Sequence, residues 1–340
     1  MSRTGVTVLV LVAFAPSVVA AVLLWPDRGD GGVAPLSASA AAPDELSAGD
    51  FSGSEQPSGE GGDRIVGDLG AQAADPVEVD FGNPPRAGVM FDVDSGELLW
   101  KRAAGREVAI ASLTKMMTAR VISESHGPEE RVLISRRAAE TNGSKVGVLP
   151  VGRKVPLEPL FHALLMTSAN DAAVALAEHD AGSVPRFVHR MNLEARAMRL
   201  RCSHFSTPSG LKNRGNYSCA LDLAALARAN LADPRIARVV RRREASFPFP
   251  GKVGSLDLYN NHYFLTRGIA GVPGAEVTGL KTGLTLEAGR CYVTTARLGD
   301  RHLGVVLLDT PDPFRQIPRL LRVGFGVSAK GVRESYPASE

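Results

Sequence analysis

Apolar and polar positions between residues 84 and 330 change from a strand pattern to a helical pattern and back. Residues 87–102 alternate or run apolar on either side of Asp94-Ser95-Gly96. Turn-forming residues between two such runs are typical of a β-hairpin. Near the other end, short loops separate three more strand-like runs, over residues 274–283, 289–298 and 301–309. These runs predict an antiparallel meander.

The stretch between the strand patterns has helical spacing. Within residues 112–124, apolar side chains recur every three or four positions, which predicts a helix with one buried face. Ser218 is expected to cap a later helix, and Pro318 to start or kink a last one over 314–326. Strands at both ends with helices between them indicate an α+β fold, an antiparallel sheet flanked by helices with a helical subdomain. The same spacing predicts further helices over residues 159–166, 171–178 and 221–231.

Residues 1–26 predict a membrane segment. A basic residue precedes 21 uncharged residues from Gly5 to Trp25, a length that crosses a bilayer core of about 30 Å as a helix. The charge bias places the amino terminus inside. A secretory signal usually has a shorter apolar core of about 7–15 residues, so we expect an uncleaved transmembrane anchor, with a cleaved signal as the alternative. Both alternatives place the rest of the chain outside the cell membrane.

Residues 27–83 predict an acidic, disordered linker, because they are rich in small residues, Pro and Gly and cannot bury a core. Residues 27–85 carry 12 acidic and 2 basic residues, whereas residues 86–340 carry 24 acidic and 36 basic ones. A basic folded part, over 84–330 with a tail over 331–340, suits polyanionic surroundings such as phospholipid headgroups or wall polymers.

Composition and missing motifs exclude several classes of protein. The chain has three Cys and seven His, without an HExxH or CxxC pattern, so we predict no metal and no cofactor. No nucleic-acid-binding motif occurs, and the export segment argues against such a partner. A GxSxG pattern, which an α/β-hydrolase needs, is absent as well.

The first candidate for chemistry is Ser112-Leu113-Thr114-Lys115, at the start of a predicted helix. Residues three apart share a helix face, so the amine of Lys115 can take the proton of the Ser112 hydroxyl. The chain has 31 Arg but only 8 Lys. Position 115 carries a Lys, the residue type of the two that can lose its proton and act as a base when buried. By itself, an SxxK pattern is expected by chance in a chain of this length.

The second candidate is Ser168-Ala169-Asn170, at the junction of two apolar helical runs. One explanation is a helix break with a capping residue. The functional interpretation makes Ser168 a proton relay and Asn170 an amide that orients the substrate and the lysine.

The third candidate is Lys281-Thr282-Gly283, on a predicted strand. Gly283 would let a substrate backbone come close to the strand edge. Lys281 would supply positive charge, and Thr282 a hydroxyl for a carboxylate. The alternative is a glycine bulge beside a solvated lysine.

In this order, SxxK, SxN and KTG resemble the penicillin-recognising serine enzymes. The surrounding segments resemble the low-molecular-weight penicillin-binding proteins, specifically the serine-type D-alanyl-D-alanine carboxypeptidases. The resemblance covers about residues 84 to 328, essentially the whole folded part. It rests on residues 110–122, 164–179, 205–211, 216–227 and 279–293.

The resemblance implies a fold of the penicillin-binding and β-lactamase type, and acyl transfer on D-Ala-D-Ala stem peptides of peptidoglycan, with β-lactams as covalent inhibitors. Ser112 would be acylated and Lys115 would be its base, with Ser168 and Asn170 as the SxN corner. Backbone N–H groups of Ser112 and of the residue after KTG would form the oxyanion hole. The KTG side of the site would comprise Lys281, Thr282, Gly283 and Leu284.

Two features depart from the pattern of these enzymes. Some of them carry an Arg shortly before KTG that helps to hold the substrate carboxylate, whereas this chain has Asn260, Asn261 and His262 in that stretch. Carboxylate binding could then fall to Thr282, Thr285 or Arg290, and the sequence does not rank them. Relatives often add a carboxy-terminal β domain and a terminal anchor; since only residues 331–340 follow the folded part, we expect neither here.

Alternative functions remain within and outside this class. Endopeptidase or transpeptidase action on cross-links is open, because these motifs do not set the acceptor. A class A β-lactamase is disfavoured because no ExxLN pattern follows Ser168. A catalytically silent wall-binding module is disfavoured because the motif residues are intact.

The cysteines predict one disulfide. An exported location permits such bonds, and Cys202 and Cys219 flank a loop-like stretch rich in Ser, Gly, Asn and Pro. We therefore expect a Cys202–Cys219 bridge. Cys291 lies in a strand pattern and is expected to be a buried free thiol.

Overall fold

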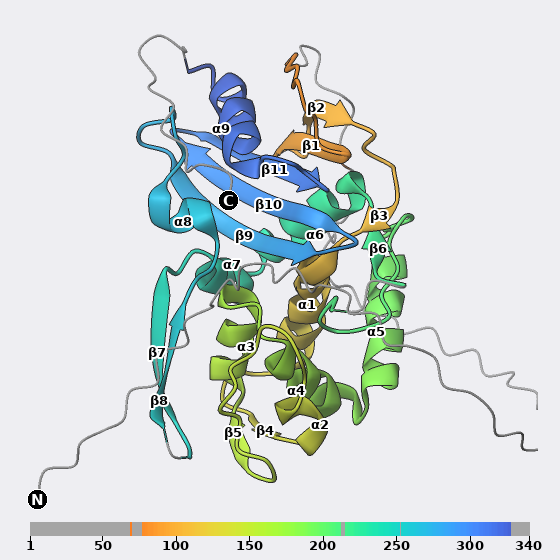
Figure 1. Ribbon diagram of the computed structural model, residues 1–340, viewed down its shortest axis with the longest axis vertical. Coiled ribbons are helices and arrows are strands. Elements are labelled where there is room, and N and C mark those ends of the chain that lie inside the picture. The colour runs from red at the N-terminus through yellow and green to blue at the C-terminus, as the bar shows by residue number, and fades with distance from the viewer. Residues whose placement is uncertain (1–68, 70–76, 212–214, 252, 328–340) are drawn as a thin grey trace, which may run out of the picture. The chain divides into compact units, whose positions relative to one another are not determined.

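The computed structural model describes residues 69, 77–211, 215–251 and 253–327 (Figure 1). The predicted anchor or signal over 1–26, nearly all of the predicted linker and the tail over 331–340 lie outside these residues. Among the helices of the described part, none has the length and apolar character to span a membrane.

A five-stranded antiparallel sheet holds both ends of the folded part together, in the order β2-β1-β11-β10-β9. The amino-terminal hairpin turns at Asp92–Gly96, where Asp92 Oδ1 accepts the N–H groups of Asp94 and Ser95 at 3.0 and 2.9 Å. The predicted hairpin and meander are both confirmed (Figure 1). The strands are β1 (Ala87–Asp92), β2 (Leu98–Arg102), β9 (Glu276–Thr285), β10 (Gly289–Leu298) and β11 (Arg301–Leu308).

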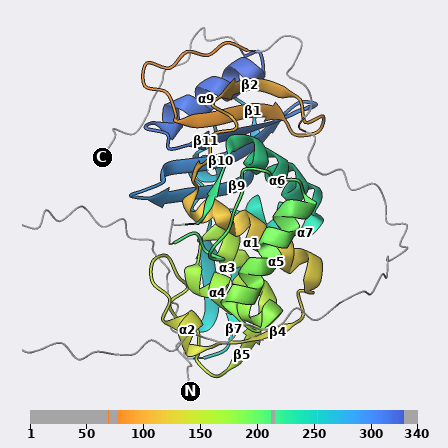
Figure 2. The ribbon, with the colours of Figure 1, turned by 90° about the vertical axis from the view of Figure 1, so that its right-hand side faces the viewer.

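Each face of this sheet buries a core of its own, because successive side chains of a strand point to opposite faces. Met90 packs in a core with Leu320 of α9 (Pro313–Gly324), near α8 (Tyr263–Arg267). The next residue, Phe91, lies in the larger core, which includes Leu226 of α6 (Ala220–Ala232). The sheet therefore lies between α9 and the helical part of the fold (Figure 2).

The helical part surrounds α1, which contacts α3, α4, α5, α6 and α7. Three small antiparallel ribbons, β3–β6, β4–β5 and β7–β8, complete it. The predicted α+β architecture with a helical subdomain is confirmed. The helical elements are η1 (Ala111–Thr114), α1 (Lys115–Ser125), α2 (Arg136–Ala139), α3 (Leu157–Met166), α4 (Asn170–Ala181), α5 (Val184–Ala197) and α7 (Pro234–Val240). The ribbon strands are β3 (Val108–Ala109), β4 (Arg131–Leu133), β5 (Lys154–Pro156), β6 (Tyr217–Ser218), β7 (Glu244–Phe249) and β8 (Gly254–Tyr259).

Two predicted helix starts are wrong. Ser218 does not cap α6, because it belongs to β6 and its hydroxyl lies 2.7 Å from that of Ser203. Pro318 does not start α9, which begins at Pro313 after Asp312, whose side chain accepts the N–H of Arg315. Pro318 lies inside the helix, so the alternative of a kink there stays a prediction. Sequence reasoning also missed α5, although it has a start signal, a serine cap with Pro185 next to its first residue.

The predicted disulfide is present. Cys202 and Cys219 are bonded, with their Cα atoms 5.7 Å apart. The bridge joins the segment after α5 to the start of α6. Cys291 is a buried free thiol in β10, as expected.

Candidate active site

Ser112 lies in the short 3-10 turn η1, and Lys115 is the first residue of α1. The preceding residue, Ala111, has a φ of +47°, a strained conformation that commonly marks functional positions. The Lys115 Nζ lies 3.0 Å from the Ser112 Oγ. The SxxK spacing therefore brings the hydroxyl and the amine into contact, although the predicted α-helix begins three residues after Ser112.

Lys115 is fully buried and has three oxygen partners. Besides Ser112, its Nζ donates to the Asn170 Oδ1 at 2.8 Å and to the Ser209 carbonyl at 2.7 Å. Loss of hydration lowers the pKa of Lys115 well below its usual value, and the positive charge of Lys281 lowers it further. A neutral amine is thereby favoured next to the serine hydroxyl, as a proton acceptor requires.

Ser168 and Asn170 lie at the break between α3 and α4. The φ of Ser168 is +60°, and its buried hydroxyl has no hydrogen-bond partner among the residues that the structure describes. Asn170 Nδ2 donates to the Asn142 carbonyl at 2.8 Å, while its oxygen accepts from Lys115. Asn170 is thus held in one orientation. A buried hydroxyl without a protein partner is unusual and calls for an explanation, of which a catalytic role is one.

Asp171 connects the start of α4 to the loop at residues 146–147. Its two carboxylate oxygens accept the N–H groups of Val146 and Gly147, each at 2.9 Å. Burial raises the pKa of Asp171 above its usual value. Sequence reasoning did not single out Asp171.

Strand β9 is the edge strand of the sheet and passes next to Ser112. A Cβ on Gly283 would lie 3.0 Å from both the Ile110 oxygen and the Ser112 nitrogen, so this position admits only glycine without movement. Lys281, two residues earlier on the same strand, is almost fully buried, and its Nζ donates to the Thr282 carbonyl at 2.9 Å. Burial lowers the pKa of Lys281 to about 7.

The segment 205–211 supplies a site component that sequence reasoning did not name. The Ser209 carbonyl accepts from Lys115, and the Pro208 carbonyl accepts from the Thr118 hydroxyl at 2.7 Å. Gly210, with a φ of +75°, lies against the Ala111 carbonyl. A Cβ at this position would overlap that carbonyl. The sequence signals were the resemblance of residues 205–211 to the low-molecular-weight penicillin-binding proteins and the Pro-Ser-Gly turn composition of this segment.

The candidates for carboxylate binding differ in their surroundings. The Thr282 hydroxyl donates to the Asn261 Oδ1 at 3.4 Å, close to the motif. Arg290 Nη1 donates to the Pro311 carbonyl at 3.3 Å, and Thr285 Oγ1 accepts the Ala288 N–H at 3.1 Å. Leu284 is 56% exposed. Of the three candidates, Thr282 alone belongs to the KTG motif, and its hydroxyl is within reach of an amide in the stretch that precedes the motif.

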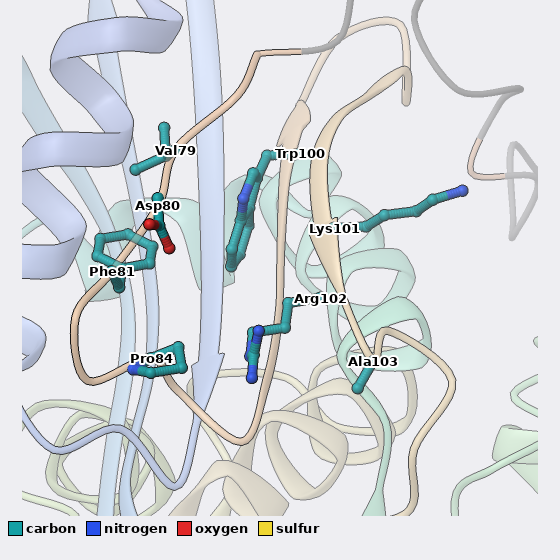
Figure 3. Close-up of a pocket in the computed structure, with 8 residues that line it drawn as sticks. All are labelled: Val79, Asp80, Phe81, Pro84, Trp100, Lys101, Arg102 and Ala103. Atoms are coloured by element: carbon teal, nitrogen blue, oxygen red, sulfur yellow. The ribbon is translucent and has the colours of Figure 1, made fainter.

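A pocket of about 410 Å³ lies elsewhere, between residues 79–84 and β2 (Figure 3). Trp100 and Arg102 point toward the segment that carries Phe81, whereas Lys101 points away from it. The residues that line this pocket belong to none of the three motifs and include no serine or cysteine. This pocket therefore shares no residue with the SxxK, SxN and KTG motifs.

Comparisons with known proteins agree with this geometry. The family model for D-alanyl-D-alanine carboxypeptidases matches residues 83–312. DacF of Bacillus subtilis is 29% identical over 71% of this chain and 62% of its own length, and DacA of Escherichia coli is 33% identical over 63% and 53%. Both are D-alanyl-D-alanine carboxypeptidases by name. The chain thus spans about three fifths or less of the length of these relatives.

Solved structures show the same fold. A D-alanyl-D-alanine carboxypeptidase from Mycobacterium tuberculosis superposes with a TM-score of 0.68 at 28% identity, over 77% of this chain and 98% of the other. A mutant of a Streptomyces DD-transpeptidase superposes with a TM-score of 0.65 at 27% identity, over 73% and 100%. The family match covers well over half of the chain and includes all three motifs. The chain therefore belongs to the D-alanyl-D-alanine carboxypeptidase family.

Proposed function

We propose that this protein is a serine D-alanyl-D-alanine carboxypeptidase that trims peptidoglycan stem peptides. The observation that carries the proposal is Lys115, fully buried, 3.0 Å from the Ser112 hydroxyl and with a lowered pKa. A serine hydroxyl is a weak nucleophile until such a base takes its proton. We place the catalytic domain at residues 84–330, of which the family match covers residues 84–312.

In the acylation step, the Ser112 oxygen attacks the carbonyl carbon of the D-Ala-D-Ala amide while Lys115 takes the hydroxyl proton. The N–H groups of Ser112 and Leu284 stabilise the negative oxygen that forms, a contribution of about 3–4 kcal/mol for one such donor. The carbon–nitrogen bond then breaks, and the leaving amine of the terminal D-Ala receives a proton. Water resolves the ester on Ser112 and releases the shortened peptide.

The other motif residues hold the substrate and move the proton. Ser168 relays the proton between Lys115 and the leaving amine, for which its unpartnered hydroxyl is suited. Asn170 fixes the orientation of Lys115 through their 2.8 Å bond. Lys281 and Thr282 bind the substrate carboxylate, and the edge of β9 pairs with the extended peptide.

The test is covalent labelling together with product release. Intact-mass measurement after penicillin treatment should show one adduct on the wild-type protein and none on Ser112→Ala. A D-Ala-D-Ala peptide should release D-Ala only with the wild type. An adduct that persists in Ser112→Ala contradicts the proposed nucleophile.

A cross-linked peptide dimer, added as a second substrate, separates carboxypeptidase from endopeptidase action. The comparison set contains a D-alanyl-D-alanine endopeptidase from Pseudomonas aeruginosa that is 30% identical over 66% of this chain and 75% of its own length. Faster cleavage of the dimer than of the monomer would favour that alternative.

We further propose that residues 1–26 remain as a single-pass anchor and that residues 27–83 extend the domain into the wall. The support is the run of 21 uncharged residues and the acidic, Pro/Gly-rich spacer. The measurement is sequencing of the mature amino terminus together with membrane fractionation. A start near Ala21 and a soluble product would show a cleaved signal instead.

A further inference from the structure

A second cluster of reactive side chains lies where α1 and α4 end. His126 directly follows α1, His179 lies in the last turn of α4, and Glu130 precedes β4. Helix α1 begins at Lys115 and has 11 residues, so at about 1.5 Å per residue its two ends are roughly 16 Å apart. The cluster is therefore separate from the candidate active site.

The three side chains converge on one point. Glu130 Oε2 lies 3.0 Å from His126 Nδ1 and 2.9 Å from His179 Nε2. The two imidazole rings are 4.8 Å apart between centroids, and one ligand atom of each of the three side chains lies within 4.8 Å of the others. We propose that His126, Glu130 and His179 bind one Zn²⁺ ion that clamps the ends of α1 and α4 to the loop before β4.

The ligand set and its spacing suit zinc. Two imidazole nitrogens and one carboxylate form a known zinc ligand set, with a fourth, open position for water. Bonds of about 2.0–2.2 Å in a tetrahedron require ligand atoms about 3.3–3.5 Å apart. The observed separations of 2.9 and 3.0 Å need an outward shift of only a few tenths of an ångström. The side chains are 15–41% exposed, so water can reach the fourth position.

The groups around the cluster have the pattern that supports metal ligands. His126 bonds through its other nitrogen, Nε2, to the Asp180 Oδ1 at 2.9 Å, the carboxylate–histidine arrangement typical of metal-binding imidazoles. The second oxygen of Glu130 accepts the Gly127 N–H at 2.8 Å. The Asp180 side chain has no exposed surface, and its Oδ2 has no hydrogen-bond partner within the described part of the chain.

The charges around the site also favour a cation. Arg190 Nη1 donates to the Asp180 Oδ1 at 2.6 Å and offsets that carboxylate, which leaves the charge of Glu130 for the ion. Arg235 donates to the His126 carbonyl at 2.6 Å, but it is paired with Glu158 at 2.7 Å. The carboxyl ends of α1 and α4 carry partial negative charge and attract cations.

The location indicates what the ion does. Lys115 is the first residue of α1, and Asn170 is the first residue of α4. A clamp at the opposite ends of the same two helices would limit their relative movement. Because Lys115 and Asn170 hydrogen-bond each other at 2.8 Å, the ion would help to preserve that contact.

The test uses the full chain without an affinity tag, stripped of metal with a chelator. Calorimetric titration with Zn²⁺, and metal analysis after gel filtration, should give one ion per chain. At a hundredfold excess over Kd, the Tm should rise by roughly 5–10 °C. Mg²⁺ and Ca²⁺ should not produce the shift, because they prefer oxygen ligands.

Variants make the test specific. His179→Gln and Glu130→Gln should each weaken zinc binding at least tenfold and lose the Tm shift, whereas His189→Gln, at an exposed site on α5, should keep both. One cooperative unfolding transition in chelator shows that each variant is folded. The proposal is overturned if the wild-type chain binds no stoichiometric zinc. It is also overturned if both cluster variants bind zinc as the wild type does.

Discussion

Gly283→Ala tests the idea that the edge strand β9 must touch the turn that carries the proposed nucleophile, Ser112. The alanine Cβ would lie 3.0 Å from the Ile110 oxygen, 3.0 Å from the Ser112 nitrogen and 3.2 Å from the Ala111 Cβ. Ordinary contacts begin near 3.4 Å. All three neighbours belong to the backbone or lie next to it, so the strand itself must move by a few tenths of an ångström.

The expected loss in acylation rate depends on which reacting groups the movement of the strand displaces. A misplacement of about 1 Å at reacting groups costs about 100-fold in rate, and the loss of an oxyanion donor costs about 100- to 1,000-fold. A shift of a few tenths of an ångström at both the Ser112 and Leu284 N–H groups should therefore slow acylation by about 10- to 100-fold. That loss corresponds to about 1.4–2.7 kcal/mol in the barrier. The same overpacking should lower the free energy of unfolding by about 1–3 kcal/mol.

The assay is the second-order rate constant for acylation by a fluorescent penicillin, measured beside thermal unfolding. Gly105→Ala is the matched control, because a Cβ there meets nothing within 4 Å and its φ is also outside the positive range. The control should acylate at the wild-type rate. Wild-type acylation by a folded Gly283→Ala protein would refute the close approach of β9 to Ser112 as a requirement.

Two further predictions concern stability. Burial lowers the pKa of Lys281 from 10.5 to about 7, so between these pH values the unfolded chain holds a proton that the folded chain lacks. The free energy of unfolding should then rise with pH over that window, by up to about 1.4 kcal/mol per pH unit. Lys281→Met should reduce the pH dependence of the free energy of unfolding, raise stability near pH 7 and abolish acylation. An unchanged pH dependence, measured by denaturant titrations at several pH values, would contradict this. Replacing both Cys202 and Cys219 by Ser opens a loop with a sequence separation of 17. The free energy of unfolding should fall by about 3 kcal/mol, measured by urea unfolding, and an equal stability would argue against the bridge as a constraint.

Local patterns in the sequence were enough for the strands of the five-stranded sheet, for the helices α1, α3, α4, α6 and α9, and for the candidate motifs. Alternation around Asp94–Gly96 and in the three carboxy-terminal runs depends only on which face of a strand is buried. The three-residue spacing of Ser112 and Lys115 is also a local feature, because one helical turn places residues at this spacing next to each other. The disulfide was also predictable, because the uncharged amino-terminal segment, which predicts export, and the loop between the two cysteines are both features of the sequence.

Contacts between distant parts of the chain were decided only by tertiary structure. Ser209 lies 94 residues after Lys115, and its role depends on a backbone carbonyl that no residue type announces. Ser218 had the right chemistry for a helix cap, but pairing with β3 drew it into a ribbon. His126 and His179 are 53 positions apart and match no metal motif, yet the packing of α1 against α4 places both beside Glu130. Sequence periodicity states which face of an element is buried, whereas only the packed fold decides which ends of which elements meet.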